Sequence, residues 1–292
     1  KQTLSADEFR RFSACLMLGI AFAATIGGLG TLIGTPPNAF FAGFMQQRGQ
    51  PIGFGQWMLL AMPLVVIYLV AAWTILTCIA FPIRAGELPG GRELIRGEFA
   101  KLGRLSRGEW IVLAVFALTA TAWIAREPLA NWKWFAAQAP AILRLDDAWI
   151  AIAAALALFA LPVDARRGVF ALDWPTAKKV PWEVLLLFGG GLSLSAAMTS
   201  SGLADWIGGR VSLLAAWPPW VAIAAVAALV LLVTEFASNL ATASALLPIL
   251  ASVAAGMQID ELWLLVPATI AATCGFAMPV GTPPNALVFG SG

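Results

Sequence analysis

The sequence predicts an all-α polytopic membrane protein with inverted repeats, a re-entrant hairpin and two helices broken at the same hexapeptide. Three observations predict this fold class. Of the 292 residues, 60% are hydrophobic and 12% are charged, whereas soluble domains are about half apolar and a quarter charged. Apolar runs long enough to cross a bilayer core recur along the chain. The hexapeptide GTPPNA occurs twice, at 34–39 and 281–286.

The composition also excludes several classes of protein. There is no His, and the three Cys lie in apolar runs, so neither a His/Cys zinc site nor a disulfide framework is indicated. No phosphate-binding GxxxxGK[ST] run is present, which argues against an ATP-driven pump housed in this chain. A net charge of +2 gives no reason to expect a nucleic-acid partner. Because the chain begins at Lys1 without a signal-peptide pattern, we expect an internal piece of a longer protein.

Eight apolar runs predict the helices in order. They are 12–34, 57–81, 110–125, 148–163, 182–203, 217–236, 240–256 and 262–281. The runs 217–236 and 240–256 are divided only by Ala237, Ser238 and Asn239, with no charged loop between them. Two helices that meet at a polar tip predict a re-entrant hairpin, because irregular backbone at membrane depth is tolerated only inside protein or beside a cavity.

Basic residues indicate which side of the membrane each loop occupies. With a re-entrant hairpin, the loops at 1–11, 84–108 and 164–181 share one face and carry most of the 18 Lys and Arg. The positive-inside rule places this face in the cytoplasm and predicts a multi-pass protein of the cell inner (plasma) membrane.

The hydrophilic stretch 84–108 divides the chain. We expect it to form a short amphipathic helix on the cytoplasmic side. Residues 1–83 are then the C-terminal part of a first repeat, with a broken helix and the following span. Residues 109–292 form a second repeat with three spans, the hairpin at about 217–256 and a broken helix from 262, its last span missing.

The identity of the two hexapeptides extends upstream. Residues 23–27 parallel 271–275, after which one gap residue is needed. In the predicted topology the first copy leaves the cytoplasm and the second enters it, so the two have opposite orientations. Inverted repeats with helices interrupted by Gly and Pro indicate the substrate site of a secondary transporter.

The residues of each break suit ion binding. Pro36 and Pro283 lack an N–H and disfavour helix at the preceding residue. Thr35 and Thr282 can cap the half-helices that begin there. Each break therefore offers carbonyls for a cation and amide donors for an anion. A structural kink is the alternative, although two identical inverted copies argue against it.

The hairpin tip, 234–242, reads TEFASNLAT. Together with the run LLLFGGGLSLSAAMTSSGLADWIG at 185–208 and the two breaks, it resembles the divalent anion/sodium symporter family. That family carries di- and tricarboxylates or sulfate on two inverted repeats, each with a Ser-Asn-Thr hairpin and a helix broken at a Thr/Ser-Pro-Pro-Asn loop. The resemblance covers the chain and implies that four helices and a first hairpin precede it and a final helix follows.

The resemblance implies roles for single residues. It implies one sodium site from Thr234, Ala237, Asn239 and the carbonyl of Gly281, and a second that uses the carbonyl of Gly34. It implies that the anion meets Ser238, Asn239, Thr282, Pro283, Thr35 and Pro36. The sequence departs from the family at Leu240, where a Thr is expected, so the substrate class stays open.

Other polar residues have alternative explanations. Glu235 is ionisable in an apolar hairpin and is a functional candidate as a proton relay or cation attractor. Alternatively it faces a watery cavity or binds an Arg or backbone groups near the tip. Residues 189–191 are Gly and favour close helix packing. Asp146, Asp147, Asp260 and Glu261 are expected to be solvated loop residues.

Three classes of function compete. The favoured one is a secondary active transporter that couples sodium to a divalent anion by symport, with sodium as the coupling ion and no cofactor. The resemblance further implies a homodimer and alternating access. A proton-coupled or antiporting permease of the citrate/arsenite type is the alternative. An intramembrane enzyme is not expected, because the spans hold no Ser/His pair, acid pair or metal-binding pattern.

Overall fold

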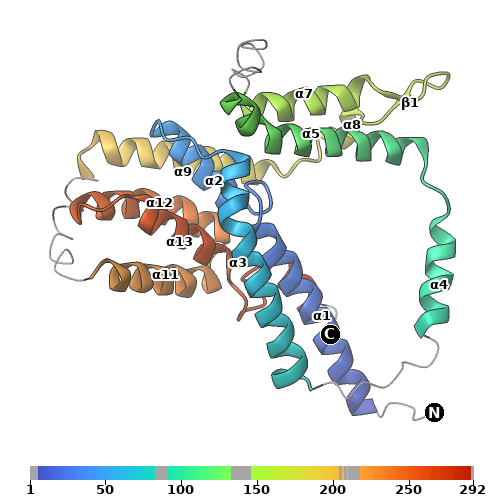
Figure 1. Cartoon of the computed structure of the whole chain (residues 1–292), viewed down its shortest axis with the longest axis horizontal. Coiled ribbons are helices and arrows are strands. Elements are labelled where there is room, and N and C mark those ends of the chain that lie inside the picture. Colours follow the sequence, from blue (N-terminus) through green and yellow to red (C-terminus); the bar gives the residue numbers. More distant parts are fainter. Residues whose placement is uncertain are drawn as a thin grey trace. The chain divides into compact units, whose positions relative to one another are not determined.

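The computed structural model describes residues 6–82, 91–132, 146–203, 206, 209 and 218–290 (Figure 1). These residues are almost entirely helical. Five of the helices within them are long and apolar enough to cross a membrane, namely Glu8–Leu29, Phe54–Ala80, Arg107–Asn131, Pro219–Phe236 and Asn239–Gly256. The predicted fold class of an all-α polytopic membrane protein is confirmed.

The chain forms two compact units. The first contains residues 53–56 and five further elements: helices α4 (Gly91–Leu102), α5 (Arg107–Asn131) and α7 (Asp147–Ala160), and a hairpin of strands β1 (Pro162–Asp164) and β2 (Val169–Phe170). It also contains the short helix α8 (Trp174–Ala177). Helix α4 forms within the predicted linker, parts of which lie outside the described residues. The two strands pair antiparallel and were not expected from the sequence.

The first unit is held by polar contacts at helix ends. The side chain of Ser106 accepts from the Glu109 N–H and the Glu109 carboxylate accepts from the Ser106 N–H, a capping box that starts α5. At the other end of α5, Arg126 pairs with Asp147 at 2.8 Å. The prediction that Asp147 is merely solvated was therefore wrong, because that carboxylate joins α5 to the start of α7.

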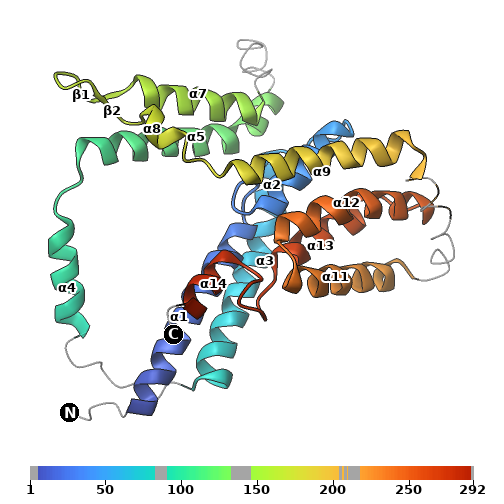
Figure 2. The same ribbon diagram turned by 180° about the vertical axis from the view of Figure 1, so that it is seen from behind.

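The second unit contains the predicted repeat elements. They are α1 (Ala6–Leu29), α2 (Pro36–Gln47), α3 (Phe54–Thr74) with the π-helical turn η1 (Ile75–Ala80), α9 (Trp182–Ser200), α11 (Pro219–Phe236), α12 (Asn239–Gly256), α13 (Leu262–Thr273) and α14 (Pro283–Gly290). Helix α12 packs against α9, α2 and α13, and α11 packs against α13, so these C-terminal helices lie side by side (Figure 1). The short helix α14 lies along α1 (Figure 2).

Both broken helices end before the hexapeptide. Helix α1 ends at Leu29 and α13 at Thr273, rather than at the predicted residues 34 and 281. The first stop follows from the weak helix formers in Gly-Gly-Leu-Gly at 27–30. The second lies just ahead of Pro279, which lacks an N–H and disfavours helix at Met278. Each break is therefore a segment of several residues rather than a point.

A glycine allows the close contact between α9 and its neighbours. A Cβ on Gly191 would lie 2.5 Å from the Cβ of Ser244 on α12 and 2.8 Å from the ring of Phe40 on α2. No atom lies within 4 Å of a Cβ on Gly189 or Gly190. The prediction of close packing therefore holds for Gly191 alone, and this residue sets how near α9 approaches the two helices that lead to the site.

Candidate functional site

In each break an asparagine side chain hydrogen-bonds to the unwound backbone. In the first break, the side-chain amide of Asn38 donates to the carbonyls of Gly28, Leu29 and Thr31 at 3.4, 3.2 and 2.9 Å. These carbonyls lost their helical partners where α1 unwinds, and the asparagine replaces those partners. Asn38 is fully buried, so the half-helix α2 is tied to the end of α1.

The second break repeats this arrangement. The amide of Asn285 donates to the carbonyls of Gly275 and Met278 at 3.0 and 3.3 Å. In addition, the Gly281 N–H donates to the Met278 carbonyl at 3.0 Å. In the first break the Gly34 N–H likewise donates to the Thr31 carbonyl at 3.2 Å. The two copies therefore share their internal hydrogen bonds as well as their sequence.

These matching contacts fix the register of the repeat. The asparagine reaches the residue ten positions earlier in each copy, which is Gly28 in one and Gly275 in the other. The gapped sequence comparison paired Gly27 with Gly275 and was wrong by one residue at this point. With the structural pairing no gap is needed from Gly28 onward.

The glycine of each hexapeptide is required by a close approach of backbone. A Cβ on Gly281 would lie 2.6 Å from the carbonyl oxygen of Gly275. A Cβ on Gly34 would overlap the carbonyl oxygen of Gly28. Real Cβ atoms do not come this close to an oxygen, so only Gly fits at either position. The carbonyls that the resemblance assigns to sodium are thus placed by a turn that only glycine allows.

The predicted hairpin tip joins α11 to α12 through two residues. Ala237 leaves α11 with extended backbone, Ser238 precedes α12, and Asn239 is the first residue of that helix. The side chain of Ser238 is exposed and makes no capping hydrogen bond. This geometry matches the predicted pair of helices meeting at a polar tip, whereas re-entry into the membrane remains a prediction.

Asn239 brings the tip and the second break together. With its amide nitrogen turned inward, Asn239 donates to the Gly281 carbonyl at 2.9 Å, to Thr234 Oγ1 at 2.8 Å and to the Ala272 carbonyl at 3.1 Å. Thr234 is fully buried and its hydroxyl donates to the Ala272 carbonyl at 2.6 Å. Asn239 therefore directly contacts two other predicted sodium ligands, Thr234 and Gly281.

The orientation of the Asn239 amide decides what this cluster can hold. With the nitrogen inward, each of the three surrounding oxygens receives a hydrogen bond. With the oxygen inward, four oxygen atoms face one another: Thr234 Oγ1, Asn239 Oδ1 and the carbonyls of Ala272 and Gly281. Oxygens at such distances repel one another unless a hydrogen or a cation lies between them. The cluster is therefore suited to a hard cation that takes oxygen ligands.

Glu235, the residue after Thr234, binds the backbone of the second break. Its carboxylate accepts from the Ala277 N–H at 3.0 and 3.1 Å and from the Met278 N–H at 2.8 Å. Of the explanations open from the sequence, the contact with backbone groups near the tip is the one observed. Adjacent residues of α11 thus bind the last turn of α13 at Ala272 and the unwound segment at 277–278.

The two breaks meet through their threonines. Thr35 precedes α2 with extended backbone, as predicted for a cap, yet its hydroxyl makes no capping bond. It lies instead 3.3 Å from the hydroxyl of Thr273, at the end of α13. Thr282 keeps the predicted capping role, since its hydroxyl accepts from the Asn285 N–H at 3.3 Å. Both Thr35 and Thr282 are buried.

The remaining predicted residues occupy the expected backbone positions. Pro36 and Pro283 are the first residues of α2 and α14. Within the described residues, no hydrogen bond joins Gly34 to the tip cluster. Leu240, where the family pattern has Thr, is 4% exposed and belongs to the apolar interior.

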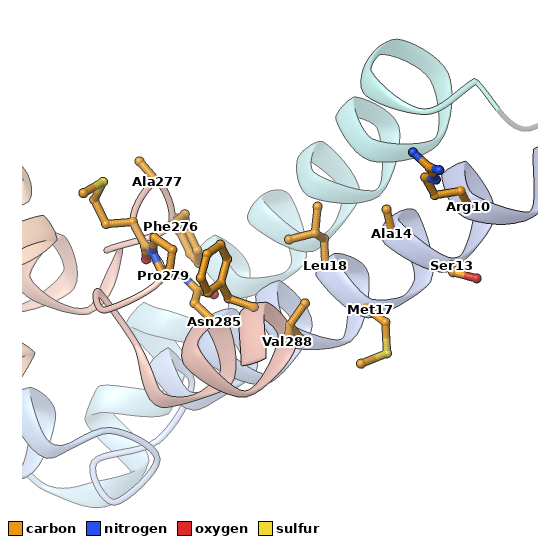
Figure 3. A pocket seen from close by; sticks show the side chains of 12 residues that line it. Arg10, Ser13, Ala14, Met17, Leu18, Phe276, Ala277, Pro279, Asn285 and Val288 are labelled. Atoms are coloured by element: carbon orange, nitrogen blue, oxygen red, sulfur yellow. Dashed lines mark hydrogen bonds between the residues drawn. The ribbon is translucent and has the colours of Figure 1, made fainter. Parts of the chain in front are cut away.

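A cavity of about 680 Å³ lies beside the second break (Figure 3). Arg10, Ala14 and Leu18 of α1 form one wall, and Phe276 and Pro279 of the break form another, as Figure 3 shows. The lining is mostly apolar. None of the predicted sodium or anion ligands lines this cavity, so it is separate from the tip cluster.

Sequence reasoning missed several residues of the site. It gave no role to Asn38 and Asn285, although both stand in the repeated hexapeptide, where a polar side chain next to two prolines could have marked them. It also missed the Ala272 carbonyl and the Thr273 hydroxyl. These two carry no sequence signal, because their partners lie 38 and 238 residues away.

Comparison with known proteins identifies the family. The family described as the sodium:sulfate symporter transmembrane region matches residues 2–292. The chain belongs to this family. The match spans both breaks and the tip, and it confirms the resemblance seen in the motifs. Because the family is one of transporters, it also confirms that the chain is not an enzyme.

Individual relatives give the same assignment. The sodium-dependent dicarboxylate transporter SdcS of Staphylococcus saprophyticus is 41% identical over 288 residues, which are 98% of this chain and 54% of that protein. SdcS of Staphylococcus aureus is 41% identical over 287 residues, with the same coverage. The chain thus spans about half the length of the curated relatives it matches.

Proposed function

We propose that this chain forms part of a secondary active transporter that couples sodium to the uptake of a divalent anion. The observation that carries the proposal is the meeting of Asn239, Thr234 and the Gly281 carbonyl at the hairpin tip. In secondary transporters, unwound backbone carbonyls and half-helix ends at a repeat interface bind the coupling ion. The second break supplies an unwound carbonyl of this kind, and the tip supplies the start of a half-helix.

The proposed sodium site uses oxygen atoms from three segments. Thr234 supplies its hydroxyl from α11, Asn239 its side-chain oxygen from α12, and Gly281 its carbonyl from the break. The carbonyl of Ala272 adds a fourth oxygen, and Ala237 is proposed to add its own carbonyl from the tip. The Asn239 amide turns its oxygen inward when the ion binds. Gly34 is proposed to supply a carbonyl to a second site, as the resemblance implies.

The proposed anion site uses the positive ends of half-helices. Helices α2, α12 and α14 each begin at a predicted site residue, so the positive end of each helix dipole lies there. Such helix starts bind carboxylate and sulfate oxygens well. Ser238 and Asn239, Thr282 and Pro283, and Thr35 and Pro36 are the residues at these starts.

The relatives favour a dicarboxylate among the candidate anions. They are named as sodium-dependent dicarboxylate transporters, whereas the family description refers to sulfate. We further propose a homodimer in the plasma membrane, with the hairpin re-entrant from the side opposite the cytoplasm and alternating access between the two faces. Residues 1–83 and 109–292 are then parts of two inverted repeats.

Uptake by the full-length protein in proteoliposomes tests the proposal. Radiolabelled succinate, citrate and sulfate are offered with an inward sodium gradient or with choline in its place. We expect uptake of one of these anions to require sodium. Equal uptake in choline would overturn sodium coupling. Uptake driven by a proton gradient without sodium would instead identify the proton-coupled permease.

A further inference from the structure

Glu235 occupies a position that is unfavourable for a carboxylate unless it has partners. It lies in the last turn of α11, which ends at Phe236, and the C-terminus of a helix carries partial negative charge. A carboxylate there is destabilised by the helix dipole. Hydrogen-bond donors from elsewhere must therefore offset this cost.

The donors come from the unwound segment after α13. That helix ends at Thr273, so the N–H groups of Ala277 and Met278 have no helical acceptor. The Glu235 carboxylate accepts from both, at distances of 2.8 to 3.1 Å. Hydrogen bonds to an ionised acceptor are about twice as strong as neutral ones. The carboxylate thus replaces the missing turn of helix and cross-links α11 to the break.

This cross-link lies within a chain of contacts that ends at the Gly281 carbonyl. Met278 is held on both sides, because its N–H binds Glu235 and its carbonyl accepts from Asn285 and from the Gly281 N–H. The Gly281 carbonyl, three residues further on, faces Asn239 at 2.9 Å. Fixing Met278 therefore fixes the start of the turn that aims the Gly281 carbonyl at the tip.

We propose that Glu235 is a positioning residue for sodium binding, which rests on the function proposed above. It holds the second break against the hairpin tip, so that the Gly281 carbonyl stays within reach of Thr234 and Asn239. It does not contact the ion. Its loss weakens sodium binding because the ligands from the tip and the break are no longer held together. Anion affinity at saturating sodium is unaffected.

Two substitutions separate the charge from the reach of the side chain. In Glu235→Gln the amide nitrogen would face the N–H donors of the break, so at most one oxygen still accepts. In Glu235→Asp the carboxylate is kept on a chain shorter by one methylene. Glu261→Gln is the matched control, because Glu261 is also a carboxylate of this unit and pairs with Arg48 at 2.8 Å instead of binding the break.

The first measurement is sodium-dependent succinate uptake by the full-length protein in proteoliposomes. We expect Glu235→Gln to raise the half-saturating sodium concentration about tenfold or more, with the maximal rate within about twofold of wild type. Glu235→Asp should be intermediate, and Glu261→Gln should match wild type. The KM for succinate at saturating sodium should be unchanged in all of them.

The second measurement needs no transport. Sodium raises the unfolding temperature of the detergent-solubilised protein by mass action, against choline as the matched salt. We expect the sodium dependence of this shift to move to about tenfold higher concentration in Glu235→Gln. If Glu235→Gln fails to fold, Glu235→Asp provides the same test. Its sodium dependence should move to higher concentration by less than that expected for Glu235→Gln.

The outcomes distinguish the two proposals. If uptake by the wild type does not depend on sodium, the proposed function is refuted. The positioning role of Glu235 in sodium binding is then refuted as well. Sodium-dependent wild-type uptake with unchanged sodium affinity in both Glu235 variants would refute the role of Glu235 alone. A raised KM for succinate at saturating sodium, without a change in sodium affinity, would show that Glu235 acts on the anion and would also overturn the inference.

Discussion

The hydroxyls of Thr35 and Thr273 lie 3.3 Å apart in the buried interior of the second unit. One belongs to the first break and the other to the last residue of the helix that leads into the second. In the second break the hydroxyl of Thr282 instead accepts from the Asn285 N–H at 3.3 Å. The two repeats are therefore joined by an asymmetric polar contact.

Breaking this contact should lower stability in a non-additive way. We expect Thr273→Val to cost about 1–3 kcal/mol, because it leaves the buried Thr35 hydroxyl without its partner. Thr35→Val should cost less, because the Thr273 hydroxyl still donates to the Thr269 carbonyl at 3.5 Å. The double variant should cost less than the sum, since no unpaired hydroxyl remains. Thermal unfolding in detergent measures this. Thr121→Val is the control, because that hydroxyl is exposed and bonds within its own helix. Strict additivity would show that the two hydroxyls do not interact.

The close approach of backbone in each break predicts which glycines can be replaced. Gly281→Ala would place a Cβ 2.6 Å from the Gly275 carbonyl, and Gly28→Ala would place one 2.8 Å from the Gly34 carbonyl. We expect both variants to lose at least about tenfold in sodium-driven uptake, because the carbonyl at each turn is displaced. Gly27→Ala is the control, since no atom lies within 4 Å. Equal loss in Gly27→Ala would contradict the register of the repeat.

Removing the Asn239 side chain, which joins the tip to the second break, should abolish sodium-driven uptake. We expect Asn239→Ala to reduce sodium-driven succinate uptake to background, because Thr234, Ala272 and Gly281 lose their common partner. The measurement is initial uptake rate at matched expression, with the unfolding temperature as a check on folding. Asn131→Ala, at the end of α5, should behave as wild type. Normal uptake by Asn239→Ala would mean that the tip is only a turn.

Helix α9 tolerates a larger residue on one face and not on the other. We expect Gly191→Val to destabilise the protein by about 1–3 kcal/mol, because a side chain there collides with Ser244 and Phe40. Gly190→Val, one residue earlier, has open space around it and should cost little. Unfolding temperatures of the two variants decide the matter. Equal stability would show that α9 does not approach α12 and α2 as closely as the structure has it.

The sequence by itself determined the fold class, the two breaks and the polar tip. Each of these is a local property of the chain. Apolar runs fix the spans, prolines and glycines forbid regular helix at the hexapeptides, and Ala237 and Ser238 separate α11 from α12. Family membership followed from the same motifs, because they occur in a fixed order and spacing.

Only the tertiary structure decided which polar groups meet. The contact of Asn239 with the Gly281 carbonyl, and that of Glu235 with 277–278, join residues about 40 positions apart. Thr35 and Thr273 are 238 positions apart. No periodicity or spacing encodes such pairs, because they depend on how α11, α12 and α13 pack. The tertiary structure also corrected the repeat register by one residue. In each break the hexapeptide glycine lies against one earlier glycine, Gly34 against Gly28 and Gly281 against Gly275.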